Sequence, residues 1–194
     1  MSNDALTGRT ARLVPLSVDH AESLLPSASD PEVWRWMPRP RPESLAEIRS
    51  MLEQMIDDPA RRCFTVQRLD DQSVVGSTSL YEVDLVQGRA EIGATWFDRS
   101  CWGGPYNTES KLLLFSHAFD TLGLTRVALR TDNLNERSQK ALIHLGLVAV
   151  GSRQVARQSR VQGAARHRAM RPATVALNPR IPKQNARRWS SKPT

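Results

Sequence analysis

The sequence has few cysteines and no long hydrophobic run. Its two cysteines, Cys63 and Cys101, do not make a disulfide framework, and neither they nor the four histidines show metal-ligand spacing. The apolar runs are short, as in residues 112–115, and far below the roughly 20 residues of a membrane span. The opening MSNDALTGR lacks the basic and apolar parts of a signal peptide. We therefore expect a cytoplasmic, reduced protein with no metal and no membrane contact.

Acidic residues are absent from the last part of the chain. Residues 137–194 contain 13 of the 27 Lys and Arg residues and none of the 20 Asp and Glu residues, whereas residues 1–136 have a net charge of −6. A hydrophobic fraction of 40% over 194 residues is enough for a core. The charge split indicates that the end of the chain follows different chemistry from the rest.

Hydrophobic patterning predicts an α+β protein, with three central strands in an antiparallel meander. A strand, loop, helix and strand then follow, and a right-handed crossover of this kind makes the two strands parallel. The predicted strands cover 10–16, 62–69, 74–83, 90–97, 125–129 and 147–150. The predicted helices run from 17 or 19 to 25, from 44 to 56, from 107 to 122, and from the capping residues 131–135 to 145.

The stretch CWGGPYNTESK, residues 101–111, joins the fourth of these strands to a helix. Adjacent glycines let backbone N–H groups approach a ligand, and a helix start adds free N–H groups and partial positive charge. Asn107 or Thr108 suits the helix cap, while Pro105 stiffens the turn and removes one donor. The physics alone leaves two interpretations open: a tight strand-to-helix turn and an anion pocket. It is not a nucleoside triphosphate loop, because Lys111 lies inside the helix.

Two segments, EIGATWFDRSCWGGPYNTESKLLLFSHAF and LGLTRVALRTDNLNERSQKALIHLGL, resemble the GNAT superfamily of N-acetyltransferases. With RTARLVPLSVDHAESLL and PEVWRWMP, they are most similar to the branch of ribosomal-protein N-terminal acetyltransferases. The resemblance covers about residues 9–150. It implies a mixed, mostly antiparallel central sheet flanked by helices, with a splayed parallel strand pair at the cofactor site.

The resemblance also implies that acetyl-CoA is the donor substrate and that no metal is needed. In this family the loop binds the cofactor pyrophosphate through backbone amides, and the pantetheine arm lies along the end of the preceding strand. The chain departs from the usual loop, since Pro105 replaces the second glycine and Asn107 the small residue. The implied cofactor-binding residues are Thr95, Trp96, Phe97, Trp102, Gly103, Gly104, Tyr106, Asn107, Thr108 and Asn135.

Amine acetylation needs a base for the amine and a proton for the leaving thiolate. The resemblance implies Glu91 as the base, and the alternative is a surface carboxylate on a strand. The family's thiolate-protonating Tyr is absent, because Leu142 occupies its position. In the branch that this chain resembles, Ser138 is the implied proton donor; the alternative is a capping or packing role. For Asn135, the alternative to a cofactor contact is a helix cap, since Asn is a favourable capping residue.

The resemblance implies that Trp34 and Trp36 wall the acceptor pocket. Tyr81, on the second strand of the predicted meander, is a candidate contact for the acceptor amine. The alternatives are core filling for the two tryptophans and a surface turn for Tyr81. A negative charge over residues 1–136 suits a cationic acceptor, either a protein N-terminus or a small amine. Monomer and homodimer are both compatible with the sequence. Cys101 has no required role in direct transfer.

We expect residues 1–151 to form the acetyltransferase domain, 152–178 a diverged closing hairpin of it, and 179–194 a disordered basic tail. The candidate hairpin strands are QVARQSRV, residues 154–161, and HRAMRPATVAL, residues 167–177. The segment is also open to interpretation as a nucleic-acid-binding arm, or as the product of an ancestral reading-frame shift near residue 150. The alternative function is therefore a weakly active or inactive protein of this fold whose tail binds nucleic acid.

Overall fold

The computed structural model of the chain describes residues 4–145, 147–152 and 172–177. Residues up to 128 form one compact unit, and those from 129 onward form a second. Two predicted segments, the candidate strand over 154–161 and the tail over 179–194, lie outside the described residues. No helix within the described ranges combines the length and apolar character needed to cross a membrane.

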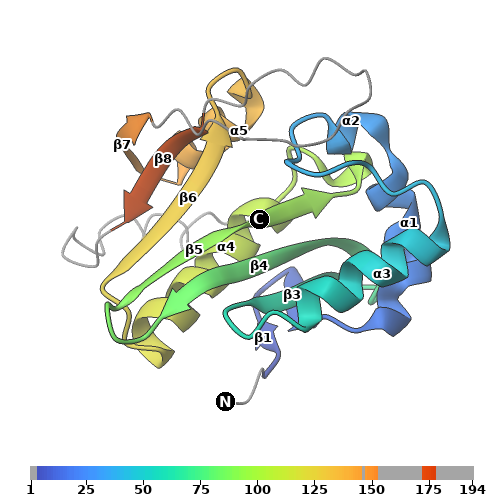
Figure 1. Cartoon of the computed structure of the whole chain (residues 1–194), viewed down its shortest axis with the longest axis horizontal. Helices are drawn as coiled ribbons and strands as arrows, with labels where there is room; N and C mark the ends of the chain where they lie inside the picture. The colour runs from blue at the N-terminus through green and yellow to red at the C-terminus, as the bar shows by residue number, and fades with distance from the viewer. Residues whose placement is uncertain (1–3, 146, 153–171, 178–194) are drawn as a thin grey trace, which may run out of the picture. The chain divides into compact units, whose positions relative to one another are not determined.

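The first unit contains a sheet in which five strands pair antiparallel with their neighbours in chain order (Figure 1). The strands are β1 (Leu6–Thr7), β2 (Ala11–Pro15), β3 (Arg62–Arg68), β4 (Val74–Asp84) and β5 (Arg89–Phe97). Strands β3, β4 and β5 form the predicted meander, which is confirmed. The short β1 was not predicted, because two residues carry no alternation.

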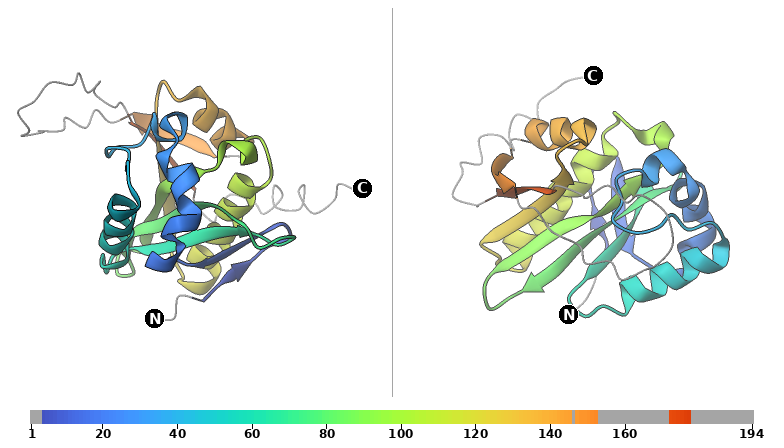
Figure 2. Two further views of the ribbon diagram at one scale, coloured as in Figure 1. Left: turned by 90° about the vertical axis from the view of Figure 1, so that its right-hand side faces the viewer. Right: turned by 45° about the horizontal axis from the view of Figure 1, so that its top comes forward.

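Helices lie on both faces of this sheet (Figure 2). Helix α1 (Ala21–Ser29), entered through the turn η1 (Val18–His20), and helix α3 (Leu45–Ile56) cover one face, and the short helix α2 (Pro31–Trp34) lies between them in the chain. Helix α4 (Tyr106–Ser116), which continues into the short π-helix η3 (His117–Thr121), covers the other face. The Ser44 hydroxyl caps α3 by accepting a hydrogen bond from the Glu47 N–H.

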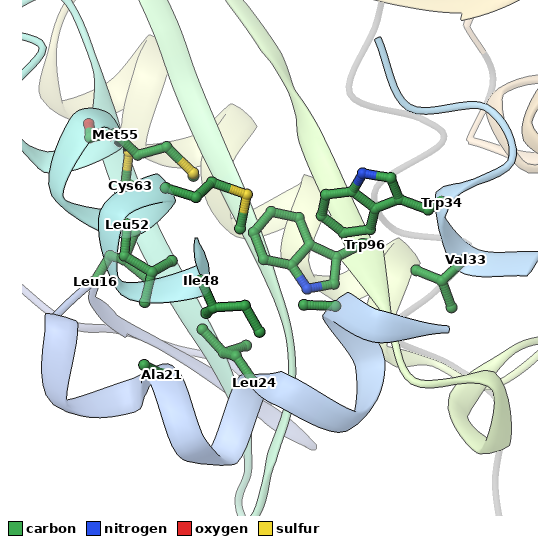
Figure 3. Close-up of a cluster of buried hydrophobic side chains, with 12 residues drawn as sticks. Leu16, Ala21, Leu24, Val33, Trp34, Ile48, Leu52, Met55, Cys63 and Trp96 are labelled. Carbon is green, nitrogen blue, oxygen red and sulfur yellow. Dashed lines mark hydrogen bonds between the residues drawn. The ribbon is translucent and has the colours of Figure 1, made fainter. Parts of the chain in front are cut away.

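The core on the α1–α3 side is built from these helices and the sheet (Figure 3). Trp34 from α2 and Trp96 from β5 meet edge to face, with ring centroids 5.4 Å apart. Such a pair adds about 1 kcal/mol to the stabilisation gained from burying the rings. The apolar residues that surround the pair are Leu16, Ala21, Leu24, Ala28, Val33, Ile48, Met51, Leu52, Met55 and Cys63.

Strand β6 (Arg126–Asp132) follows α4 and crosses the boundary between the units. Its first residues lie beside the start of β5, because the N–H groups of Thr125 and Arg126 donate to the Gly88 carbonyl at 2.7 and 3.0 Å. Two strands that start at one edge and are joined by a helix run in the same direction. The α+β class, with a mostly antiparallel sheet and a parallel pair after the loop, is confirmed.

The second unit contains the rest of β6, helix α5 (Glu136–His144), β7 (Val148–Ser152) and β8 (Pro172–Leu177). Strands β7 and β8 pair antiparallel, with Val148 opposite Ala176 and Ser152 opposite Ala173. The predicted strand over 167–177 is confirmed for 172–177, its described part, and there it pairs with β7; its predicted pairing with 154–161 lies outside the described residues. The domain boundaries at 151 and 178 stay predictions.

Candidate active site

A β-bulge sets the direction of the side chains at the end of β5. The extra residue is Ala94, with a φ of 48°, and it shifts the register between β4 and β5. Because side chains alternate along a strand, the bulge moves Trp96 onto the sheet face that carries Glu91. It turns Thr95 to the other face, where its hydroxyl lies 2.8 Å from that of Thr78. Hydrophobic patterning did not indicate this bulge.

The side chains of Trp96 and Phe97 at the end of β5 are buried. The Trp96 side chain is 3% exposed and belongs to the core. Phe97 is buried too, and its carbonyl accepts a hydrogen bond of 3.1 Å from the indole N–H of Trp102. A role for Thr95, Trp96 and Phe97 in cofactor binding stays a prediction, and for Trp96 and Phe97 it is a prediction about main-chain atoms.

The loop after β5 leads directly into the start of α4. A short turn, η2 (Arg99–Cys101), is capped by Asp98, and the Gly104 N–H donates to the Cys101 carbonyl at 3.2 Å. Gly103 has a φ of 77°, which favours glycine. Pro105, whose ring has no acceptor atom, occupies the cap position of α4. The first N–H groups of α4 therefore point out of the helix without a side-chain cap, the arrangement that binds anions.

Asn107 lies inside the first turn of α4, so the prediction that Asn107 or Thr108 caps this helix is wrong. The side-chain oxygen of Asn107 instead accepts a hydrogen bond from the Lys111 ammonium at 2.6 Å. Lys111 is only 6% exposed. Burial lowers the pKa of Lys111 to about 8. The helix spacing placed Lys111 inside α4 but gave no sign that its charge is buried.

Glu109, in the same turn, connects α4 to the turn between β1 and β2. Its carboxylate accepts hydrogen bonds from the N–H groups of Arg9, Thr10 and Ala11 and from the Thr10 hydroxyl. Gly8 permits this approach, because a Cβ there would lie 2.5 Å from the carboxylate. Burial alone raises the pKa of Glu109, but the hydrogen bonds from Thr10, Arg9 and Ala11 outweigh it and lower the pKa. Sequence reasoning missed this contact, since no local pattern links residues so distant in the chain.

Glu91 and Tyr81 lie directly opposite each other on β5 and β4. The Tyr81 hydroxyl donates a hydrogen bond to the Glu91 carboxylate. Glu91 is 3% exposed, so its interpretation as a surface carboxylate is wrong. Tyr81 is half-buried, and its ring lies against Gly93, where a Cβ would come within 2.7 Å of the ring. The Arg61 guanidinium lies 5.5 Å from the ring centroid.

The two tryptophans predicted to wall an acceptor pocket differ in their surroundings. Trp34 is buried, and its indole N–H donates to the carbonyls of Arg39 and Pro40 at 3.1 and 2.8 Å. It fills the core and also fixes the segment that follows α2. Trp36 is half-buried, with the Arg35 guanidinium 5.5 Å from its ring centroid. A contact of either ring with an acceptor stays a prediction.

Asn135 and Ser138, both in the second unit, are joined by a helix cap. The Asn135 side chain accepts a hydrogen bond of 3.1 Å from the Ser138 N–H at the start of α5. This confirms the capping interpretation of Asn135, and its contact with a cofactor stays a prediction. Ser138 is half-buried, and its role as a proton donor also stays a prediction. Leu142, at the position of the family's Tyr, is buried on α5.

Neither the loop nor the strand pair has the donor set of a metal site. Within the part of the chain that the structure describes, no three His, Cys, Asp or Glu side chains gather as they would around a metal ion. The two cysteines are free thiols, Cys63 buried and Cys101 partly exposed. Burial raises the pKa of the Cys63 thiol, which makes it a poor nucleophile.

Comparison with known proteins identifies the class of protein to which this sheet, loop and uncapped helix belong. Residues 11–148 match the family model described as an acetyltransferase (GNAT) domain. Because the match covers more than half of the 194 residues, the chain belongs to the GNAT acetyltransferase family. Its class is therefore that of an N-acetyltransferase. The narrower resemblance to ribosomal-protein acetyltransferases stays a prediction.

Individual relatives agree with the family. The chain is 29% identical over 141 residues to the uncharacterized N-acetyltransferase p20 of Bacillus licheniformis, covering 70% of this chain and 78% of that protein. A crystal structure assigned as an acetyltransferase from T. thermophilus has a TM-score of 0.79 and 30% identity, over 96% and 95% of the two chains. Mycobacterium smegmatis RimJ in complex with CoA-disulfide has a TM-score of 0.75 and 21% identity, over 93% and 88%, and shows likeness of fold.

Proposed function

We propose that this chain transfers the acetyl group of acetyl-CoA to a primary amine by direct attack of the amine on the thioester. The acceptor is a protein N-terminus or a small amine. No acetyl-enzyme forms, and no metal takes part. Binding of CoA-disulfide by the structurally similar RimJ supports the choice of donor. The basic segment behind the nucleic-acid alternative lies largely outside the described residues, and nothing in the described part favours that function.

The observation that carries this proposal is the start of α4. A positive-φ glycine, Gly103, and a proline cap leave the first N–H groups of α4 directed outward, immediately after β5. Backbone donors of this kind, with the partial positive charge of the helix terminus, suit the pyrophosphate of CoA. The Glu109 contacts to residues 9–11 hold this turn of α4 in place.

The roles of the side chains follow from what direct transfer requires. The acceptor must lose a proton before it attacks, and Glu91 is the base that receives this proton. The tetrahedral adduct then expels the CoA thiolate, which Ser138 protonates while its oxygen takes up the remaining proton of the former amine nitrogen. Asn135 contacts the cofactor. Trp36 and the turn fixed by Trp34 border the acceptor. Donors aimed at the developing oxyanion come from strand backbone near the β5 bulge.

The test compares two glycines that share a backbone conformation. Gly103 and Gly123 have φ values of 77° and 67°, and an added Cβ at either has nothing within 4 Å. Gly103→Asp and Gly123→Asp therefore cost similar strain, but only the first places a carboxylate at the start of α4. We expect Gly103→Asp to weaken acetyl-CoA binding about tenfold or more through charge repulsion, and Gly123→Asp to leave it unchanged. Isothermal titration calorimetry measures both affinities.

Two results would contradict the proposal. If wild-type protein binds neither acetyl-CoA nor CoA at millimolar concentrations, the start of α4 is not a pyrophosphate site. If it binds acetyl-CoA but releases no CoA thiol in the presence of peptide N-termini, polyamines or amino acids, transfer to a primary amine is wrong. Equal loss of affinity in both glycine variants would assign the effect to backbone strain rather than to the loop.

A further inference from the structure

The burial of Glu91 creates a difficulty for its role as base. An acceptor amine arrives from solvent, yet the carboxylate is only 3% exposed and receives a hydrogen bond from the Tyr81 hydroxyl. Tyr81 itself is half-buried. The phenol therefore lies between the carboxylate and any group that approaches it from the Tyr81 side.

We infer that Tyr81 is a catalytic residue that relays the acceptor's proton to Glu91. This inference rests on the proposed acetyl transfer and assigns a different atom, the Tyr81 hydroxyl, to meet the acceptor. From its place on the predicted strand, Tyr81 was expected only to contact the acceptor as a binding residue. In the relay, Glu91 does not touch the amine and serves as the final proton acceptor.

The relay balances in protons and electrons. The acceptor arrives as an ammonium ion, and one of its protons passes to the Tyr81 oxygen while the phenolic proton passes to the Glu91 carboxylate. Tyr81 is thereby regenerated in the same step, and the amine becomes neutral. The amine lone pair forms the C–N bond, the C–S bond breaks, and the second amine proton ends on the thiolate. Glu91 then returns its proton to solvent.

The surroundings of the pair fit a relay in three respects. The two residues are directly opposite on paired strands, so the hydrogen bond is fixed by the sheet rather than by a loop. Gly93 on β5 leaves room for the Tyr81 ring, because a Cβ there would collide with it. The Arg61 guanidinium, 5.5 Å from the ring centroid, favours negative charge on the phenolic oxygen while the proton is in transit.

A purely structural hydrogen bond and a relay predict different kinetics. Tyr81→Phe keeps the ring against Gly93 and Arg61 and removes only the hydroxyl. Ser79→Ala is the matched control, since Ser79 is buried on the same face of β4 and loses one hydroxyl in the same way. Thermal unfolding and acetyl-CoA affinity of both variants should stay close to those of wild type.

We expect Tyr81→Phe and Glu91→Gln each to lower kcat by about 100-fold or more, and the double variant to be no slower than either single one. Ser79→Ala should keep kcat within about threefold of wild type. In mixtures of H2O and D2O, the wild-type rate should depend on the deuterium fraction with the curvature of two moving protons. If the hydroxyl had only a structural role, the double variant would not show this non-additivity. The wild-type rate would also lack the curvature of two moving protons.

Several outcomes would overturn the relay. Tyr81→Phe with near wild-type kcat, beside a slow Glu91→Gln, would mean that Glu91 meets the amine directly. A raised KM with unchanged kcat in Tyr81→Phe would mean that Tyr81 only binds the acceptor. A linear dependence of the wild-type rate on the deuterium fraction would mean that a single proton moves in the rate-limiting step. Absence of any acetyl transfer by wild-type protein is a separate result, because it removes the proposed function and not only the relay.

Discussion

Two regions of the first unit contain charged side chains that are half-buried or buried, and the hydrogen-bond partners of these side chains differ. At the start of α4, Glu109 accepts from backbone N–H groups of Arg9–Ala11, and Lys111 donates to an amide oxygen. On β4 and β5, Glu91 accepts from the Tyr81 phenol. An amide N–H does not give up its proton near neutral pH, whereas a phenol exchanges its proton readily with a carboxylate partner.

The difference separates positioning from chemistry. The backbone N–H groups keep their protons and hold Glu109 as a carboxylate, and the Asn107 oxygen that accepts from Lys111 has no proton to give. Glu109 and Lys111 therefore position this turn and affect the stability of α4. A partner that exchanges its proton makes Glu91 able to act in a reaction. The comparison predicts that substitutions near α4 change stability and its pH dependence, while substitutions in the strand pair change turnover.

The largest effect on stability should come from Lys111. Its pKa is lowered by burial from 10.5 to about 8, so the unfolded chain binds more protons than the folded chain between these values. The free energy of unfolding should therefore rise as the pH increases from 8 to 10.5, by about 3 kcal/mol. Lys111→Met should remove this rise and make the protein more stable at pH 7. Urea unfolding across this pH range measures both effects.

Lys140→Met is the control for Lys111, because the Lys140 side chain on α5 is 79% exposed. This variant should keep the rise in stability with pH. If the stability of Lys111→Met still rose with pH, another group would cause the rise. Lys111 would then no longer support the contrast between the α4 region and the strand pair.

A smaller effect is expected from Glu109. Glu109→Gln replaces a charged acceptor by an amide whose NH2 group faces other N–H groups, and should cost about 2 kcal/mol of unfolding free energy at pH 7. Because the pKa of Glu109 is lowered in the folded state, its contribution exists above the ordinary carboxyl pKa and is lost as the pH falls through the folded value. The difference from wild type should therefore shrink in acid, which urea unfolding at a series of pH values measures.

Glu136→Gln is the matched control, since Glu136 also lies in the first turn of a helix but its side chain is 80% exposed. Its cost should stay below about 0.5 kcal/mol. Equal costs for the two substitutions, or a Glu109 effect that does not change with pH, would mean that the contacts to residues 9–11 add no stability beyond the helix dipole.

Local patterns were sufficient to predict most of the fold. The spacing of three and four in residues 44–56 predicted α3, and alternation predicted the meander. The bulge at Ala94 was not predictable, because it depends on the register between two strands and not on either strand alone. The short helix α2 was not predicted, because its four residues lie in a stretch interrupted by prolines.

The candidate site was predictable in its loop and strand but not in its partners. CWGGPYNTESK indicated the turn and the helix start, while Glu91 was expected from the resemblance alone. The bonds of Glu109 to residues 9–11, the burial of Lys111 and the pairing of Glu91 with Tyr81 all join segments that only the folded sheet brings together. Hydrophobic patterning carries no information about such long-range polar contacts.

The smallest effect should come from Cys101, which provides the last test of where the chemistry lies. Its thiol is partly exposed and precedes the glycines of the loop, so a covalent route through an acetyl-cysteine would use it. Direct attack needs no such thiol, and Cys101→Ser should keep kcat within about twofold of wild type. Wild-type protein incubated with acetyl-CoA alone should show no acetyl adduct by intact mass spectrometry. A stable adduct on Cys101, lost together with activity in Cys101→Ser, would replace the Tyr81–Glu91 relay with nucleophilic catalysis, since the amine would then attack the enzyme thioester.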